Sequence, residues 1–404
     1  MERSRKEGPL AGVRGLDFSR TLAGANCATI LSDLGAEMIM IDSPTRSPGG
    51  IAKGGLPGTV FGGIDARYNY HSRGKKSLSL DIDSSKGREI FLDLVKKLDV
   101  VTNNWRPGTA EKRGVDFKSL SKVNPGIICC GITGYGTKGP YRDRASWDTI
   151  AAAHSGILSI SGEPDAPPTL VGGAIMDVST STWAALGIVA ALHERQRTGK
   201  GQQVDTSLFE VGLSLLIYFP TIYGVNGIVP RPPGQVLPQT PLGGLFPTQD
   251  GYIASGPLGN RQWPPFCRAL GLEEWADDPR FVSEELRNEN KEMLWSVVRE
   301  ATKTTTSAQL VEALVREGVA ASAVNNVAEA LADPQTSALN AVVSVEGAEG
   351  KPVQAVRSPV NFSQHPSPKY DPVPNIGQDT DNLLANLLGY SQSRIEELKA
   401  AGAI

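Results

Sequence analysis

The chain lacks the features that mark secreted, membrane-spanning and metal-binding proteins. Its four cysteines show no C-x-x-C spacing, which argues against a disulfide framework and against a zinc site. The longest run of apolar and glycine residues, 183–192, is much shorter than the ~20 residues that a membrane span requires. No apolar stretch follows the charged N-terminal segment, so a secretory signal is not expected. We therefore expect a cytoplasmic protein that binds neither a metal ion nor a membrane.

An excess of positive charge is also missing. Lysine and arginine number 40 against 43 aspartates and glutamates, which gives a formal net charge of -3 at pH 7. This balance provides no field that would attract nucleic acid, and any bound anion must meet a local basic patch. At ~150 residues per domain, the length of 404 residues predicts two or three domains.

Motifs of two common enzyme classes are absent. There is no G-x-S-x-G nucleophile motif, and the four histidines are spread singly along the chain. The turn after the first expected strand reads Ser19-Arg20-Thr21-Leu22-Ala23-Gly24, whereas a dinucleotide site requires G-x-G-x-x-G there. A histidine-centred triad and a nicotinamide cofactor are therefore not expected, and we predict no tightly bound cofactor.

The sequence does contain short apolar runs that alternate with helical periodicity, which is typical of a parallel sheet covered by helices. Strands are expected at 12–18, 37–41, 78–82, 100–103, 127–131 and 203–208. Helices are expected at 27–34, 86–98, 148–156 and 178–193. The predicted fold class is therefore α/β, with a Rossmann-like large domain.

Changes in composition divide the chain further. Residues 1–216 form the first part of the large domain, and the segment 217–245, rich in Pro, Gly and Tyr, is expected to be a crossover linker. A smaller α+β domain is expected at 246–324 and a second linker at 325–336. Residues 337–404 are expected to return to the large domain. Within these segments we expect a strand at 251–256, a hairpin near 347–350, and helices at 261–270, 283–302, 307–317, 380–388 and 392–401.

Basic residues gather beside two of the expected strands. Arg73, Lys75 and Lys76 precede the strand at 78–82, while Arg106, Lys112 and Arg113 follow the strand at 100–103. Taken singly, each is an ordinary surface charge. Placed together at the sheet edge where α/β folds bind ligands, they would suit a polyphosphorylated carrier such as a nucleotide or coenzyme A.

A glycine-rich loop, 131–141, follows the strand at 127–131 and leads to Asp148. Such a loop lets a ligand approach the backbone closely. Asp148 stands at the start of an expected helix, where it is either an N-cap residue or a reactive carboxylate.

An ordered set of motifs resembles the family III coenzyme A transferases, which include formyl-CoA transferase, carnitine CoA-transferase and, as a branch, α-methylacyl-CoA racemase. The resemblance runs through nearly the whole chain. The motifs are the segment 9–24, Asp33-Leu34-Gly35-Ala36-Glu37, Arg73-x-Lys75-Lys76-Ser77, Asn104-Trp105-Arg106-Pro107-Gly108 and Gly199-Lys200-Gly201-Gln202. The family implies an interlocked homodimer, or a heteromer with a paralogue, that acts on an acyl-CoA and a carboxylic acid.

The resemblance also implies roles for particular residues. Asp148 falls on the catalytic aspartate, which would attack the thioester and form an aspartyl anhydride and then an aspartyl-CoA thioester. The residues expected to contact coenzyme A are Leu22, Ala23, Arg73, Lys75, Lys76, Asn104, Trp105, Arg106, Lys112, Gly134, Tyr135 and Gly136. Trp105 would either stack on the ligand or pack in the protein. Oxyanion donors or a lid would come from Gly134, Tyr135, Gly136, Gly243 and Gly244.

Departures from the family pattern narrow the range of expected substrates and reactions. Leu22 stands where formyl-CoA transferases have Gln, which disfavours formate and oxalate, and Ser146-Trp147-Asp148 replaces the Gly-His-Asp of racemases. The predicted function is therefore an acyl-CoA:carboxylate CoA-transferase, with succinyl-CoA as one candidate donor. The alternatives are a 2-methylacyl-CoA racemase and a non-catalytic CoA-binding subunit. Arg20 and Arg231 are candidates to bind the second carboxylate of a dicarboxylate, or are structural and surface residues.

Overall fold

The computed structural model describes residues 7–44, 59–61, 64–237, 240–348, 350–365 and 370–404. The chain forms two compact units, each described by itself below. The larger unit contains Met1–Ile157, Val171–Pro220 and Ser337–Ile404, and the smaller contains Leu158–Leu170 and Thr221–Thr336. Both ends of the chain thus contribute to the larger unit, while the segment Leu158–Leu170 joins the smaller one.

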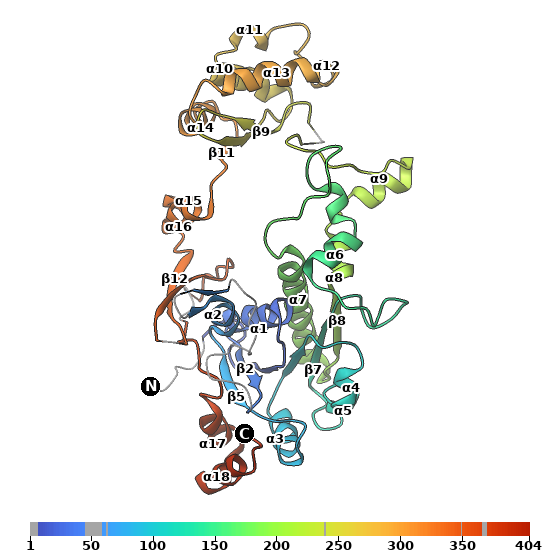
Figure 1. Cartoon of the computed structure of the whole chain (residues 1–404), viewed down its shortest axis with the longest axis vertical. Coiled ribbons are helices and arrows are strands. Elements are labelled where there is room, and N and C mark those ends of the chain that lie inside the picture. Colours follow the sequence, from blue (N-terminus) through green and yellow to red (C-terminus); the bar gives the residue numbers. More distant parts are fainter. Residues whose placement is uncertain (1–6, 45–58, 62–63, 238–239, 349, 366–369) are drawn as a thin grey trace. The chain divides into compact units, whose positions relative to one another are not determined.

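A six-stranded parallel sheet is the centre of the larger unit (Figure 1). Its order is β5 (Lys76–Ser79), β2 (Glu37–Asp42), β1 (Arg14–Asp17), β6 (Val100–Asn103), β7 (Ile128–Thr133) and β8 (Gln203–Ser207). This is the doubly wound order, in which the direction of strand succession reverses between β1 and β6. Such folds bind ligands outside the carboxyl ends of the strands at this switch point.

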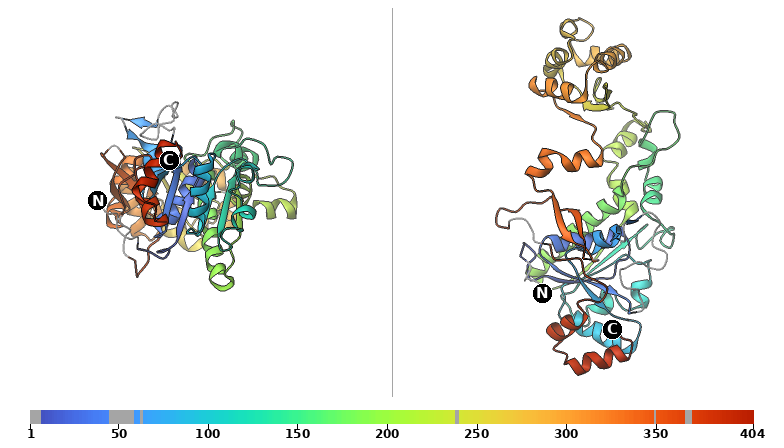
Figure 2. Two further views of the ribbon diagram at one scale, coloured as in Figure 1. Left: turned by 90° about the horizontal axis from the view of Figure 1, so that it is seen from below. Right: turned by 60° about the vertical axis from the view of Figure 1, so that its left-hand side comes forward.

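Helices cover both faces of the sheet. Helix α1 (Leu22–Asp33) packs with α7 (Ile175–Thr198) on one face. Helix α3 (Ser85–Val95) lies on the other face, and the C-terminal helices α17 (Thr380–Leu388) and α18 (Gln392–Ala400), drawn in red, lie beside it (Figure 2). Apolar side chains of these three helices and of five strands form one core. The expected strands and helices of this unit are confirmed, with ends that shift by a few residues.

Helix α7 is the longest helix and ends at Gly199, whose φ of 70° is the left-handed conformation that favours glycine. Its length and composition would suffice to cross a membrane. Its contacts with α1, β7 and β8 are instead those of a core helix. The sequence placed this helix at 178–193, three residues short at its start and five residues short at its end.

The remaining elements of the larger unit are short. They are β3 (Val60–Phe61), β4 (Ile64–Asp65), α2 (Ala66–Ser72), α4 (Thr109–Lys112), α5 (Phe117–Leu120), α6 (Asp148–His154), α8 (Leu208–Ser214), and the antiparallel hairpin β12 (Val342–Glu346) and β13 (Pro352–Val356). The predicted hairpin near 347–350 is therefore confirmed.

The two C-terminal helices are separated by a clear end and start signal. Gly389, with φ of 70°, ends α17, and the Ser391 hydroxyl accepts the Arg394 N–H at the start of α18.

The smaller unit has a three-stranded antiparallel sheet in the order β11 (Ala321–Ala323), β10 (Tyr252–Ser255) and β9 (Gly244–Pro247). Its helices include α10 (Trp263–Leu270), α11 (Glu273–Ala276), α12 (Glu284–Glu289), α13 (Lys291–Thr302) and α14 (Ser307–Arg316), with a 3-10 turn at Asn260–Gln262. A second 3-10 turn, Ile157–Ile160, begins at the last residue of the larger unit's first segment. Buried Trp263, Phe246, Phe266, Phe281 and Trp295 form most of its aromatic core.

Two sequence expectations for this region need correction. The single helix predicted at 283–302 is two helices, because the Asn290 side chain donates to the carbonyls of Leu286 and Arg280 and competes with the helical pattern. The segment 217–245 is not wholly irregular, since α9 (Phe219–Asn226) forms within it. Pro238 and Gln239 of that segment lie outside the described residues. In the second linker, a capping box of Asn326 and Glu329 starts α15 (Val327–Ala332), and Pro334 begins α16 (Pro334–Ala338).

Candidate active site

The switch point brings together two segments that the sequence singled out. Arg20, Leu22 and Ala23 follow β1, and Asn104 directly follows β6. The Asn104 amide oxygen accepts the Arg20 backbone N–H at 3.1 Å, and its amide nitrogen donates to the Thr21 hydroxyl. The two predicted coenzyme A segments therefore lie side by side at the edge where a ligand is expected.

Trp105 and the cations that follow it differ in their surroundings. The Trp105 ring packs 5.1 Å from the ring of Phe18, and the Arg113 guanidinium lies 5.1 Å from its centre. Arg113 is also paired with Asp83 at 2.7 Å. Arg106 and Lys112 are exposed and have no ion pair within the described part of the chain. Trp105 thus packs within the protein, and Arg106 and Lys112 are two cations that remain exposed after β6.

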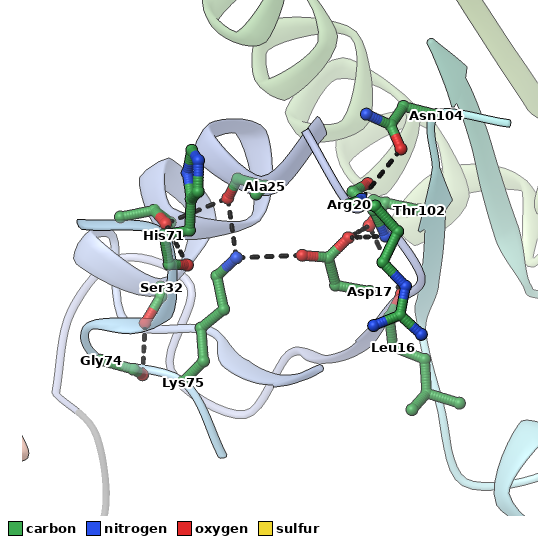
Figure 3. A network of polar contacts seen from close by, with 12 residues as sticks. Leu16, Asp17, Arg20, Ala25, Ser32, His71, Gly74, Lys75, Thr102 and Asn104 are labelled. Carbon is green, nitrogen blue, oxygen red and sulfur yellow. Dashed lines mark hydrogen bonds and ion pairs between the residues drawn. The ribbon is translucent and has the colours of Figure 1, made fainter. Parts of the chain in front are cut away.

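Lys75 lies inside the protein, in a network of polar contacts with Asp17 at the carboxyl end of β1 (Figure 3). Its ammonium donates to Asp17 Oδ2 at 2.9 Å and to the Ala25 carbonyl at 2.7 Å, and Lys75 is only 2% exposed. The Thr102 hydroxyl donates to the other oxygen of Asp17 at 2.9 Å. Lys75 thus neutralises the carboxylate at the end of β1. It could contact a phosphate only by breaking a buried ion pair, which is costly.

Arg73 and Lys76 are also engaged by carboxylates. Arg73 forms two hydrogen bonds with Asp33, at 3.1 and 2.9 Å, and is 5% exposed. Lys76 lies 3.5 Å from Glu37 at the surface. Their segment precedes β5, whereas Arg106 follows β6, and the two strands belong to one parallel sheet. Although its segment precedes β5, the Lys75 ammonium reaches Asp17, which lies level with Thr102 near the carboxyl end of β6. That the two basic segments share one ligand site stays a prediction.

Arg20, and Gly244 of the smaller unit, also make contacts that stabilise the fold. The Arg20 guanidinium pairs with the buried Asp42 at 3.3 Å. Gly244, with φ of 148°, passes so close to the Gln235 carbonyl that a side chain would clash there. Gly243, Gly244 and Arg231 all belong to the smaller unit. Their predicted roles as a lid and as a carboxylate ligand stay predictions.

The glycine loop packs directly against the segment that leads to Asp148. A Cβ atom on Gly134 would lie 2.5 Å from Cβ of Ser146, so only glycine permits this contact. The Gly134 carbonyl accepts the Phe209 N–H at 3.0 Å, and the Gly136 N–H donates to the Thr133 hydroxyl at 2.9 Å. These contacts fix the loop relative to Asp148.

Asp148 caps a helix other than its own. Its Oδ2 atom accepts the backbone N–H groups of Met176 at 2.8 Å and Asp177 at 3.1 Å, in the first turn of α7. The N-cap residue of α7 is Ala174, which has no side-chain oxygen to do this. The positive end of the helix dipole also stabilises a carboxylate at this position. Asp148 is therefore both half-buried and firmly held.

Asp177 is a second carboxylate beside Asp148, and sequence reasoning missed it. Burial and the charge of Asp148 raise the pKa of Asp177 to about 6. No hydrogen bond or ion pair engages its carboxylate within the described ranges. The only sequence signal was an acid soon after the Gly172-Gly173 pair, at the start of a long apolar stretch.

A serine one turn after Asp177 links α7 to the start of α1. The Ser181 hydroxyl lies 2.7 Å from the Asp177 carbonyl oxygen and 2.8 Å from the Ala23 carbonyl oxygen of α1. The first turns of α7, which carry Asp177, therefore pack against the start of α1, where coenzyme A is expected. Among the residues whose positions are described, no cluster of His, Cys, Asp and Glu has the arrangement of a metal site.

These features define a doubly wound α/β protein with paired carboxylates near its switch point. Residues 10–380 match the model of CoA-transferase family III. The chain is 32% identical to the succinyl-CoA–D-citramalate CoA-transferase of Chloroflexus aurantiacus, with 100% of both chains covered. It is 32% identical to the succinate–glutarate CoA-transferase of Agrobacterium fabrum, with 94% of this chain and 96% of that protein covered.

A solved structure supports the same assignment. A CAIB/BAIF family protein from Brucella suis superposes with a TM-score of 0.82 at 32% identity, covering 94% of this chain and 99% of that one. The chain thus belongs to CoA-transferase family III and is a CoA-transferase. The resemblance stated from the sequence motifs is confirmed.

Proposed function

We propose that the protein transfers coenzyme A from a donor acyl-CoA to the carboxylate of an organic acid through a covalent aspartyl intermediate. The observation that carries this proposal is the Asp148–Asp177 pair, which lies beside the glycine loop and the start of α1. Succinyl-CoA is the first donor to test, because several relatives of this chain are named for succinyl-CoA.

The geometry favours Asp177 as the attacking carboxylate. A carboxylate with a pKa of about 6 is more basic than an ordinary one and is still ionised at neutral pH. Asp148, which the sequence predicted as the nucleophile, has one oxygen committed to two backbone N–H groups. We assign Asp148 the task of positioning Asp177. Its negative charge also favours acylation, since forming the neutral anhydride removes one of two neighbouring like charges.

The reaction then balances as four exchanges at carbonyl carbons. An Asp177 oxygen attacks the thioester carbon, and the C–S bond breaks. The CoA thiolate departs, and the donor acyl group is joined to Asp177 as an anhydride. The thiolate attacks the aspartyl carbonyl and releases the donor acid, which leaves an aspartyl-CoA thioester. The acceptor carboxylate attacks that thioester and expels the thiolate, which finally attacks the new acyl carbon. The product acyl-CoA departs and the Asp177 carboxylate is restored.

Chemical trapping tests this assignment. The enzyme is incubated with acyl-CoA and then with hydroxylamine or borohydride, and the modified residue is identified by peptide mass spectrometry. We expect modification of Asp177 that requires the acyl-CoA. Modification of Asp148 instead would support the prediction made from the sequence, and a lack of any modified aspartate would contradict a covalent aspartyl intermediate.

The pH dependence gives an independent check. Because Asp177 must be ionised to attack and its pKa is raised to about 6, kcat/KM should fall about tenfold per pH unit below that value. An ordinary aspartate would keep its charge to about pH 4. Measuring kcat/KM for the acyl-CoA between about pH 4 and pH 7 distinguishes an aspartate with a raised pKa from an ordinary one. A rate that is constant between about pH 7 and pH 5 would contradict the role of Asp177.

A racemase or epimerase is the second candidate, because a carboxylate with a raised pKa also suits removal of a proton next to a thioester carbonyl. Deuterium exchange into a 2-methylacyl-CoA, without any acceptor acid, separates the two activities.

The homodimer implied by the family resemblance remains part of the proposal. A heteromer is the alternative, since one relative is named as the beta subunit of a succinyl-CoA–L-malate CoA-transferase.

A further inference from the structure

Four aromatic rings form a cluster beside the glycine loop. Tyr135 and Tyr141 come from the loop, His154 from α6, and Phe209 from α8, with ring centres 5.2–5.9 Å apart. The Tyr135 hydroxyl lies 3.1 Å from Nδ1 of His154. The cluster thus ties the loop to the helix that begins with Asp148 and offers an aromatic platform beside that loop.

Arg144 lies on this platform. Its guanidinium carbon is 3.7 Å from the centre of the Tyr141 ring, within the range of a cation–π contact. Arg144 is exposed, and no carboxylate pairs with it in the parts of the chain that the structure describes. In contrast, Arg20, Arg73 and Lys75 all have carboxylate partners. Stacking holds the guanidinium in place and leaves its N–H donors for a ligand, which lowers the entropy lost on binding.

The position of Arg144 suits a substrate with a second negative charge. Arg144 precedes Asp148 by four residues, a span of at most ~14 Å of chain. The contact of Gly134 with Ser146 fixes the segment between them. Trp147 in this segment is 60% exposed and offers an apolar surface for methylene groups. A planar guanidinium binds a carboxylate through two parallel hydrogen bonds.

We propose that Arg144, held against the ring of Tyr141, binds the distal carboxylate of a dicarboxylic substrate and sets the preference for dicarboxylic over monocarboxylic acids. This inference rests on the proposed function, because it concerns the acid that exchanges coenzyme A at the Asp148–Asp177 pair. It assigns substrate selection to a residue that the sequence motifs did not indicate.

The test compares linear dicarboxylic acids with monocarboxylic acids of matching length as acceptors, with one donor acyl-CoA throughout. The wild-type enzyme should prefer the dicarboxylic acids. Arg144→Gln should lower kcat/KM for them about ten- to a hundredfold and leave the monocarboxylic acids nearly unchanged. Arg144→Lys, which keeps the charge without the planar fork, should retain part of the preference. Tyr141→Leu should raise KM for the dicarboxylic acids with little effect on kcat.

Arg142→Gln is the control, since it removes the same charge two residues earlier in the segment that leads to Asp148 and should not alter the preference. If Arg144→Gln lowers kcat/KM equally for both kinds of acid, or raises KM for the donor acyl-CoA instead, Arg144 does not bind the distal carboxylate and the inference is wrong. A wild-type preference for monocarboxylic acids would also overturn it. These outcomes leave CoA transfer intact, whereas a wild-type enzyme that transfers coenzyme A to no acid would contradict the proposed function itself.

Discussion

Asp177→Asn is expected to lower kcat for CoA transfer by about 10⁴-fold or more, because an amide cannot attack the thioester carbonyl. The amide has nearly the shape of the carboxylate, so α7 should keep its position. At neutral pH the same substitution should raise the melting temperature. Burial and Asp148 raise the pKa of Asp177 in the folded protein. Such a group costs stability as pH rises above its ordinary pKa of about 4, and the full cost is present above its folded pKa of about 6.

Asp148→Asn is the informative comparison. Its amide oxygen can still accept the N–H groups of Met176 and Asp177, so α7 remains capped. Loss of the negative charge should lower the pKa of Asp177 and move the acid limb of the pH profile to lower pH. We expect kcat to fall by only about tenfold, as for the loss of a positioning interaction. An inactive Asp148→Asn enzyme together with an active Asp177→Asn enzyme would reverse the two assignments.

The sequence predicted the sheet well because its strands are short apolar runs separated by clear turn and helix signals. It also predicted the family, since motifs such as Asn104-Trp105-Arg106-Pro107-Gly108 are specific. The switch point between β1 and β6 could not be predicted from local patterns, because strand order depends on crossover connections.

The charged residues were harder to interpret than the apolar ones. Asp177 went unnoticed because its raised pKa depends on Asp148, which stands 29 residues earlier in the printed sequence and meets it only in the folded chain. Arg73 and Lys75 were taken as surface cations because lysine and arginine are seldom buried. Their partners Asp33 and Asp17 are distant in sequence, so periodicity gave no sign of the two ion pairs.

Lys75→Met is expected to lower the free energy of unfolding of the larger unit by about 3–5 kcal/mol. Methionine fills most of the space of the lysine stem, but it leaves the carboxylate of Asp17 buried without its cation. Urea unfolding followed by a probe within the larger unit measures the change. Adding Asp17→Asn should recover part of the loss, because the neutral amide has no charge to compensate. If Lys75 instead served only to bind a phosphate, stability would be unchanged and the affinity for coenzyme A would fall.

Lys76→Met serves as the neighbouring control. Lys76 makes a surface ion pair with Glu37 at 3.5 Å, and such exposed pairs contribute only about 0–1 kcal/mol. The two substitutions remove the same charge from adjacent positions, so a general electrostatic effect would appear in both. A large loss of stability in Lys75→Met alone would therefore locate the effect in the pair with Asp17 at the end of β1. Equal and small losses in both variants would contradict the burial of Lys75 and return it to the set of candidate phosphate ligands.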